Sequence, residues 1–400
     1  MIGYYRIQSP LSDGKETFLG AVAGALGEEV KQISLDEYLS DEAALLYVAT
    51  GGSEGYFLKL FDRIRHRHCY ILTSGDKNSL AASMEILSFL RNHGGSGEIL
   101  HGSIGDVARK IKSLTGAHAA LKKLSGKTLG CIGAPSDWLI ASDYDSDAVR
   151  KKLGLGFVTI PMAELLSEIK KGAYRENEYT ELLEKQGFDG NELKKALQVF
   201  GAFERIVEKY ALAGVSVRCF DLLDSVHTTG CLGLAILNSL GVYGGCEGDM
   251  LSLLSMAILG SVTGEGSFMC NPCRFDTKEG TAVFAHCTAP MNILSSFALD
   301  THFESGIGVA IRGVFRPGDC TVFKCAGNLG RYYAEEGFIT EMPFSETLCR
   351  TQVKVKLKGF DYFLTDPIHN HHILCRGRQK EKLDAFFWLL GEKEREKGDG

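Results

Sequence analysis

In the first third of the chain, short apolar runs alternate with stretches whose apolar residues recur at helical spacing. The predicted strands are residues 4–8, 44–49, 69–72 and 99–100. The predicted helices are residues 15–26, 56–64, 79–93 and 104–114. Short apolar strands separated by helices are typical of a parallel sheet that is covered on both faces. We therefore expect residues 1–124 to form one doubly wound α/β domain.

The same pattern restarts after residue 124. The predicted strands are residues 128–133, 157–160 and 215–220. The predicted helices are residues 162–170, 193–211, 229–240 and 250–262, and a polar connection is expected over 171–191. Residues 125–262 therefore predict a second doubly wound domain.

The pattern changes again after residue 262, where short alternating segments replace most of the helical spacing. The predicted strands are residues 281–285, 308–312, 320–324, 351–357, 362–364 and 373–376. A hairpin-type connection over 315–319 and a closing helix over 380–390 complete the pattern. The expected fold class is α/β: two doubly wound parallel-sheet, Rossmann-like domains, 1–124 and 125–262, followed by a C-terminal antiparallel β-rich, barrel-like domain, 263–400.

Composition excludes some classes of partner. The chain has 44 Lys and Arg against 50 Asp and Glu, a net charge of −6. A protein that binds nucleic acid by neutralising phosphates needs a basic excess, so we expect no nucleic-acid partner. We also expect no membrane partner, because no stretch reaches the roughly 18 uncharged apolar residues of a membrane span. The N-terminal residues lack the basic and apolar segments of a signal peptide, which favours a cytoplasmic location.

Twelve cysteines are scattered along the chain. In a chain long enough to bury an ample core, we expect them to be reduced thiols and mostly small core residues. Cys270 and Cys273 have the CxxC spacing of a structural zinc site, but no second pair follows at zinc spacing. The glycine-rich segment 51–55 matches neither nucleotide-binding pattern and predicts a tight turn.

A glycine-rich turn before the apolar helix 250–262 carries two carboxylates, in the run Cys246-Glu247-Gly248-Asp249. Asp249 is placed to cap that helix by accepting hydrogen bonds from its first amides. Glu247 has no such capping role, and a buried carboxylate needs a cation, a hydrogen-bond donor or water beside it. We therefore expect Glu247 to be a ligand or a catalytic group.

Histidines occur at two further places. His286 follows an apolar strand and precedes a turn, where a satisfied core histidine and a ligand are both open interpretations. The segment 366–372 holds His369, His371 and His372 beside Asn370, at the start of an apolar strand. Imidazole is a common metal ligand. Because neighbouring residues in a strand point to opposite faces, only one of His371 and His372 should enter a given pocket.

These motifs together carry a resemblance. The runs 246–249, 266–272, 283–290 and 370–372, in this order and spacing, resemble the L-fucose isomerase / L-arabinose isomerase superfamily, and most closely its fucose isomerase-related branch. The resemblance covers most of the chain. It implies a metal-dependent aldose–ketose isomerase of carbohydrate metabolism, with Mn²⁺ as the typical cation. In such enzymes two acidic residues move protons across an ene-diol intermediate.

The resemblance also assigns roles to residues. Glu247 matches the first metal-binding acidic residue, which is also an acid/base, and His371 matches the C-terminal histidine ligand. The second acidic position falls at Cys270 or Asn271. Asn271 can ligate a metal through its oxygen but cannot act as a base, so Asp276 or Asp249 is the candidate replacement. The expected catalytic set is Glu247, Asn271 and Asp276, and the expected metal ligands are Glu247, Asn271 and His371.

The expected substrate contacts are His286, Arg312 and Asn370. Arg274, Arg312, Arg331 and Arg350 are the C-terminal residues that could bind an anionic sugar, although each is also typical of a surface charge. Two alternatives remain: an isomerase of a charged or modified sugar, and a sugar-binding or regulatory relative with reduced catalysis. The resemblance further implies a homo-oligomer, a trimer or hexamer, with active sites between subunits.

Overall fold

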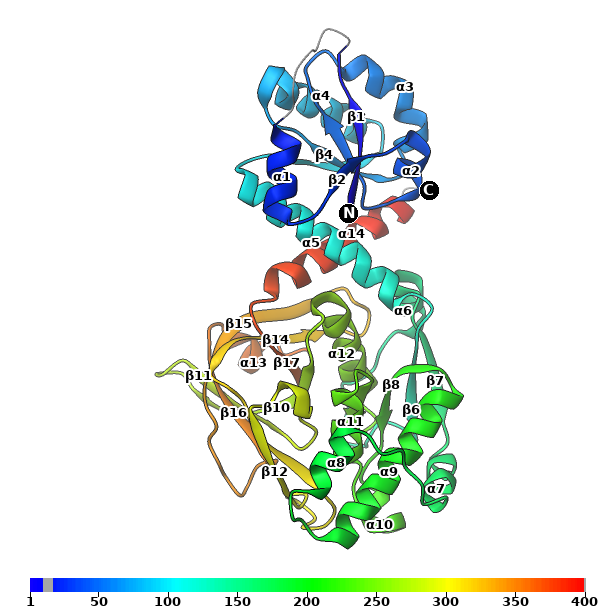
Figure 1. Cartoon of the computed structure of the whole chain (residues 1–400), viewed down its shortest axis with the longest axis vertical. Coiled ribbons are helices and arrows are strands. Elements are labelled where there is room, and N and C mark those ends of the chain that lie inside the picture. The colour runs from blue at the N-terminus through cyan, green and yellow to red at the C-terminus, as the bar shows by residue number, and fades with distance from the viewer. Residues whose placement is uncertain (10–16, 399–400) are drawn as a thin grey trace. The chain divides into compact units, whose positions relative to one another are not determined.

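A computed structural model describes residues 1–9 and 17–398 of the chain (Figure 1). The contacts divide it into two compact units, Met1–Ala120 with Asp384–Gly400, and Leu121–Leu383. Together they contain two parallel sheets and an antiparallel barrel, as the α/β fold class predicted. In the described part of the chain, no helix combines the length and the apolar character that crossing a membrane requires.

The first unit contains a five-stranded parallel sheet with the order β2-β1-β3-β4-β5. Its strands are β1 (Ile2–Ile7), β2 (Val30–Gln32), β3 (Leu45–Val48), β4 (His68–Leu72) and β5 (Ser96–Leu100). Its helices are α1 (Phe18–Leu26), α2 (Leu35–Ser40), α3 (Glu54–Ile64), α4 (Ser79–Asn92), most of α5 (Ile104–Leu124) and most of α14 (Lys380–Gly398), with a short 3₁₀ turn at η1 (Asp76–Asn78). The expected helix 15–26 is observed as α1, and its residues 15 and 16 lie outside the described residues.

Alternation along the strands explains why this sheet is covered on both faces. In β3, Leu45 and Tyr47 belong to one buried cluster, whereas Leu46 and Val48 belong to another. Successive side chains of a strand point to opposite faces, so each face has its own apolar core. This arrangement is the doubly wound sheet that the continuous apolar runs predicted.

The second unit begins with a four-stranded parallel sheet of order β7-β6-β8-β9. Its strands are β6 (Thr128–Ile132), β7 (Gly156–Ile160), β8 (Leu212–Val217) and β9 (Tyr243–Cys246). The helices are α6 (Ser146–Leu153), α7 (Met162–Lys170), α8 (Glu178–Glu184), α9 (Gly190–Lys209), α10 (Asp221–Val226), α11 (Cys231–Ser239) and α12 (Met250–Thr263). Helix α8 lies in the segment predicted as a connection, where Asn177 caps it.

A closed antiparallel barrel follows in the same unit, with the order β10-β11-β16-β15-β14-β17. Its strands are β10 (Ser267–Asp276), β11 (Thr281–His286), β14 (Gly318–Cys325), β15 (Tyr332–Glu341), β16 (Thr351–Leu357) and β17 (His372–Arg376). The 3₁₀ turn η2 (Met291–Ile293), the paired strands β12 (Ser296–Asp300) and β13 (Ala310–Val314), and the short helix α13 (Asp361–Thr365) complete it. Helix α12 packs against β8 and β9 on one side and β10, β14 and β17 on another, which explains why it is apolar all round.

Two local predictions in this part are wrong. The connection 315–319 is not a hairpin, because β13 pairs with β12 whereas β14 pairs with β15 and β17. Residues 362–364 are not a strand but lie in helix α13. Phe363 in this helix is buried against Phe275 and Phe284. A short strand would bury the same aromatic residue, so the apolar pattern did not distinguish the two structures.

Candidate functional site

The turn after β9 places Glu247 at the carboxyl end of the parallel sheet, where ligands bind in open α/β folds. Glu247 and Gly248 both adopt left-handed backbone conformations, with φ of 64° and 67°. A Cβ at Gly248 would lie 2.2 Å from the carbonyl oxygen of Ala134, so only glycine fits there. The amide of Ser136 donates to the carbonyl oxygen of Glu247 at 2.9 Å. The turn is therefore held against the loop that follows β6.

Two neighbours orient the Glu247 carboxylate. The indole Nε1–H of Trp138 donates to Oε2 at 2.6 Å, and Oε1 lies 3.6 Å from Nε2 of His371. The Trp138 ring meets Phe220 edge-on, at 5.0 Å between centroids. Burial raises the pKa of Glu247, but the interaction with His371, the charge of His286 and the Trp138 hydrogen bond outweigh it and lower the pKa to about 2. Glu247 is therefore ionised.

His371 is fully buried and uses its two ring nitrogens differently. Nδ1 lies 2.8 Å from Oδ2 of Asp249, whereas Nε2 has no hydrogen-bond partner in the described chain. The 3.6 Å between Nε2 and Glu247 is an ion-pair distance rather than a hydrogen bond. Burial lowers the pKa of His371, but the two carboxylates raise it to about 9. His372 faces the other way and contacts Tyr362 at 3.0 Å, whereas His371 faces Glu247, as expected for neighbouring residues that point to opposite sides.

Asp249 caps α12, as predicted, and also anchors His371. Its Oδ1 accepts from the Ser252 amide at 2.8 Å, and its Oδ2 accepts from the Ser252 hydroxyl at 2.5 Å. Lys324 on β14 is fully buried and donates to the same hydroxyl at 2.8 Å. Burial raises the pKa of Asp249, but Lys324 and His371 hold it well below its usual range. The charged carboxylate therefore orients the ring of His371.

His286, at the end of β11, completes the cluster. It is buried, its Nδ1 lies 3.0 Å from the Thr288 hydroxyl, and its ring centroid is 5.5 Å from that of His371. Burial, and then the charge of His371, lowers the pKa of His286 to about 4. His286 is therefore neutral at pH 7 and can offer a nitrogen lone pair.

These side chains fit a metal ion. One donor atom each from Glu247, His286 and His371 lie within 4.8 Å of one another. Ligand atoms about 2.1 Å from an octahedral cation lie about 3.0 Å apart when adjacent and about 4.2 Å apart when opposite, so a small contraction would suffice. Nε2 of His371, buried without a hydrogen-bond partner, is the atom that such a cation would satisfy.

A second group of possible donors consists of Asp249, His369 and His371. It fits a cation less well, because both carboxylate oxygens of Asp249 already accept hydrogen bonds. His369 also contacts the Ser142 hydroxyl through Nε2. Neither Asp249 nor His369 is part of the described cavity lining, whereas Glu247 and His286 of the first group both are.

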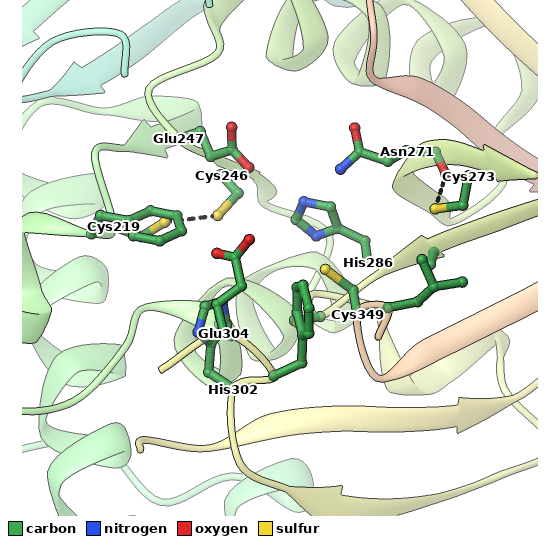
Figure 2. A pocket seen from close by; sticks show the side chains of 15 residues that line it. Cys219, Cys246, Glu247, Asn271, Cys273, His286, His302, Glu304 and Cys349 are labelled. Atoms are coloured by element: carbon green, nitrogen blue, oxygen red, sulfur yellow. Dashed lines mark hydrogen bonds between the residues drawn. The ribbon is translucent and has the colours of Figure 1, made fainter. Parts of the chain in front are cut away.

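A cavity of about 180 Å³ lies beside the first group. Its lining includes Glu247, Asn271, His286, His302, Phe220, Phe303, Glu304, Leu348 and Ala285, together with six cysteines. Figure 2 shows the carboxylates of Glu247 and Glu304 pointing into the space that these side chains surround. The lining found in the described chain contains no Lys or Arg.

The structure brings together some of the predicted site residues. Glu247, Asn271 and His286 line the cavity, and His371 adjoins it through Glu247 and His286. Asn370 donates from Nδ2 to Oδ1 of Asn271 at 3.3 Å, so it supports the wall of the cavity.

Other predicted residues lie elsewhere. Asp276 is exposed at the end of β10, where its Oδ1 accepts from the amides of Lys278 and Glu279. The guanidinium of Arg312 is exposed and stacks on Phe344, 3.8 Å from the ring centroid. The structure therefore does not bring Asp276 or Arg312 to the cavity.

The remaining candidate arginines have other partners. Arg274 donates to the hydroxyls of Ser345 and Thr347. Arg331 pairs with Asp366 at 2.8 Å, and Arg350 lies 3.5 Å from Asp300.

Sequence reasoning missed three polar residues of the site: Trp138, His302 and Glu304. Trp138 lies in the loop after β6, and the other two lie in the loop between β12 and β13. Trp138 follows a predicted strand of a doubly wound domain, which was a usable signal, because ligands bind at such strand ends. Nothing local distinguishes His302 or Glu304 from ordinary loop residues.

The twelve cysteines are free, and ten of them are buried, which confirms that most are core residues. The six that line the cavity are Cys219, Cys231, Cys246, Cys273, Cys287 and Cys349. The thiols of Cys219 and Cys246 lie 3.0 Å apart. Burial and neighbouring thiols hold the pKa of Cys246 well above its usual value, so this thiol next to Glu247 carries no charge.

Comparison with known proteins gives one informative similarity. No family model matches the chain. The sequence is 26% identical over 233 residues to a sulfoquinovose isomerase from Clostridium sp. (strain MSTE9). The alignment covers 54% of this chain and 52% of that protein, so the chain spans about half the length of the relative it matches. The similarity supports a relation to sugar isomerases, and it does not single out the L-fucose isomerase branch.

Proposed function

We propose that the protein is a metal-dependent aldose–ketose isomerase of the L-fucose isomerase type. The observation that carries the proposal is Nε2 of His371, which is buried, has no hydrogen-bond partner among the described residues, and lies with Glu247 and His286 beside a cavity. Similarity to a sugar isomerase supports the same chemistry.

Glu247, His286 and His371 would hold the cation, and Asn271 is the neighbouring amide that could add an oxygen. Carboxylate and amide oxygens suit Mn²⁺, and the family resemblance implies the same cation, so Mn²⁺ is our proposed cofactor. When bound, such a cation polarises a carbonyl and stabilises developing negative charge. Asp249 holds the His371 ring so that Nε2 faces Glu247, and Trp138 holds the Glu247 carboxylate.

The reaction moves protons without any other reactant. A base removes the proton from C2 of an aldose, and the C1–C2 double bond of an ene-diol forms. The carbonyl oxygen at C1 takes up a proton as the ene-diol forms. An acid then adds a proton to C1, and the hydroxyl at C2 gives up its proton to become the ketone, so that two protons are lost and two are gained.

The test is an isomerisation screen over a panel of aldoses, with Mn²⁺ or with EDTA. We expect ketose only with Mn²⁺, and loss of both turnover and Mn²⁺ binding in Glu247→Gln and His371→Gln. Glu346→Gln, an exposed glutamate outside the cavity lining, is the matched control and should behave as wild type. Activity that survives both EDTA and Glu247→Gln would refute the mechanism. Sugar binding without isomerisation would identify the binding-protein alternative.

The charge of the cavity bears on the substrate. The relative is named for a sulfonated sugar, which makes such a sugar the second candidate. However, the described lining offers no Lys or Arg and includes the carboxylate of Glu304. We therefore propose an uncharged aldose as the substrate. A higher kcat/KM for a 6-sulfonated aldose than for its neutral parent would overturn this choice.

We also propose that the protein is a homo-oligomer, a trimer or hexamer. Near Glu247, Trp138 and Ile140 are 51% and 90% exposed, although both are large and apolar. Contact with a second copy would remove this surface from water. Light scattering after size-exclusion chromatography measures the state directly, and a monomer at micromolar concentration would contradict the proposal.

A further inference from the structure

The proposed reaction needs two proton carriers, and the position that the family resemblance assigns to the second one falls at Cys270 or Asn271. The Cys270 thiol is buried, donates to the carbonyl oxygen of His372 and is not part of the described cavity lining. An amide neither removes nor delivers a proton at neutral pH. The candidate replacement Asp276 does not reach the cavity and is engaged with two backbone amides. Asp249 is saturated by Ser252 and His371. Another group must therefore serve.

Glu304 and Glu247 are the two carboxylates in the lining of the cavity. The two residues enter from different parts of the fold, Glu247 from the turn after β9 and Glu304 from the loop between β12 and β13. In Figure 2 the Glu304 carboxylate points toward the side of the cavity that carries Cys246 and Glu247. Both carboxylates are therefore within reach of a sugar bound in this cavity.

Hydrogen bonds within the loop that carries Glu304 hold it in a defined turn. The amide of Gly306 donates to the carbonyl oxygen of His302 at 2.8 Å, and the amide of His302 donates to the carbonyl oxygen of Ile307 at 3.1 Å. Nδ1 of His302 lies 3.1 Å from the Ser305 hydroxyl.

Both ends of this loop are also held. At its start, Arg350 donates to the carbonyl oxygen of Thr301 at 2.8 Å. At its end, Gly308 lies so close to Thr229 that a Cβ would approach the Thr229 hydroxyl to 2.7 Å. The backbone that presents Glu304 is therefore held in place at its turn and at both ends.

The two carboxylates differ in their freedom. Both oxygens of Glu247 face fixed neighbours, Trp138 on one side and His371 on the other. Among the described residues, Glu304 has neither a hydrogen-bond nor an ion-pair partner. A carboxylate with open lone pairs is better suited to exchange a proton with a substrate than one that is held as a ligand.

We propose that Glu304 is the second acid/base catalyst of this enzyme, in place of the carboxylate that the family resemblance puts at Cys270 or Asn271. The inference rests on the proposed isomerase function. Glu304 carries out one of the two proton transfers, at C1 or C2 of the sugar, and Glu247 serves the other. The proton that leaves one carbon is balanced by the proton added to the other, so no oxidant or reductant is needed.

The test compares Glu304→Gln, Glu304→Asp and the control Glu346→Gln, using the aldose and Mn²⁺ concentration at which wild type is active. General acid–base catalysis contributes roughly 10²–10⁴-fold, so kcat of Glu304→Gln should fall by that factor while KM changes little. Glu304→Asp should recover at least about tenfold of the loss, because the carboxylate remains. Mn²⁺ binding by calorimetry should match wild type in both variants, unlike in Glu247→Gln. In D₂O, Glu304→Gln should exchange hydrogen at one carbon without forming ketose.

The outcomes separate the two proposals. If Glu304→Gln keeps kcat within about threefold of wild type while Glu247→Gln is inactive, the isomerase stands and the role of Glu304 falls. A Glu304→Asp variant as inactive as Glu304→Gln, with intact Mn²⁺ binding, would also overturn the role, since shape rather than charge would then matter. If wild type isomerises no aldose, both proposals fail.

Discussion

The hydrogen bond from Trp138 to Glu247 offers a sharp test of how the site is organised. Trp138→Phe removes the Nε1–H donor, which lies 2.6 Å from Oε2, and keeps an aromatic ring against Phe220. Because this bond helps to lower the pKa of Glu247, the substitution should raise that pKa toward its ordinary value. It should also let the carboxylate rotate away from His371.

The magnitude follows from the bond and its exposure. A hydrogen bond to a charged group contributes about 1.5–3 kcal/mol. Trp138 is half exposed, so water can replace the donor in part, and about 1 kcal/mol should be lost. This corresponds to about a fivefold weaker Kd for Mn²⁺. This expected loss of affinity is smaller than the 10–100-fold typical of groups that hydrogen-bond to metal ligands, because Trp138 is partly exposed to water.

Calorimetric titration of Mn²⁺ into wild type, Trp138→Phe and Trp138→Leu measures the effect. Trp138→Phe and Trp138→Leu should lose a similar amount of Mn²⁺ affinity, because both lack the donor. Only Trp138→Leu should also lose stability, through its missing contact with Phe220. An affinity in Trp138→Phe within a factor of about 1.5 of wild type would refute the reasoning.

Three further predictions concern the same site. Gly248→Ala should lower the melting temperature in calorimetry, because a left-handed backbone costs roughly 1–2 kcal/mol for alanine. It should also abolish Mn²⁺ binding, because the new Cβ would lie 2.2 Å from the carbonyl oxygen of Ala134 and displace the turn. Gly264 also has a left-handed backbone but open space around it, so Gly264→Ala should lower the melting temperature without affecting Mn²⁺ binding. In EDTA, the free energy of unfolding in urea should fall as pH rises from 6.5 through about 9. The pKa of His371 is raised in the folded protein, so the proton that stabilises the fold is fully present below pH 6.5 and is lost as pH passes through about 9. His371→Gln should abolish this trend. Asn271→Asp should bind Mn²⁺ about tenfold more tightly in the same titration, because a carboxylate replaces an amide at the cavity wall, and an unchanged Kd would place Asn271 outside the coordination shell.

Local patterns were sufficient for much of this architecture. Continuous apolar runs identified most strands of both parallel sheets, since strands covered on two faces need apolar side chains on both. They missed β2, a short edge strand with two exposed residues, and β9, whose two glycines indicated a turn. The carboxylate just before an apolar helix identified Asp249 as a cap, because helix amides need an acceptor wherever the chain goes. Alternation in a strand separated His371 from His372. Each of these inferences depends on residues that are close in sequence.

The site depends on contacts that no local pattern encodes. His371 meets Asp249 across 122 residues, and Trp138 meets Glu247 across 109. The hairpin predicted over 315–319 was wrong for the same reason, since β13 and β14 are consecutive in sequence but belong to different sheets. A loop glutamate such as Glu304 has no periodicity to mark it. Only the folded chain brings Glu304 into the same cavity as Glu247, because long-range packing, rather than the residues beside it, determines where its loop lies.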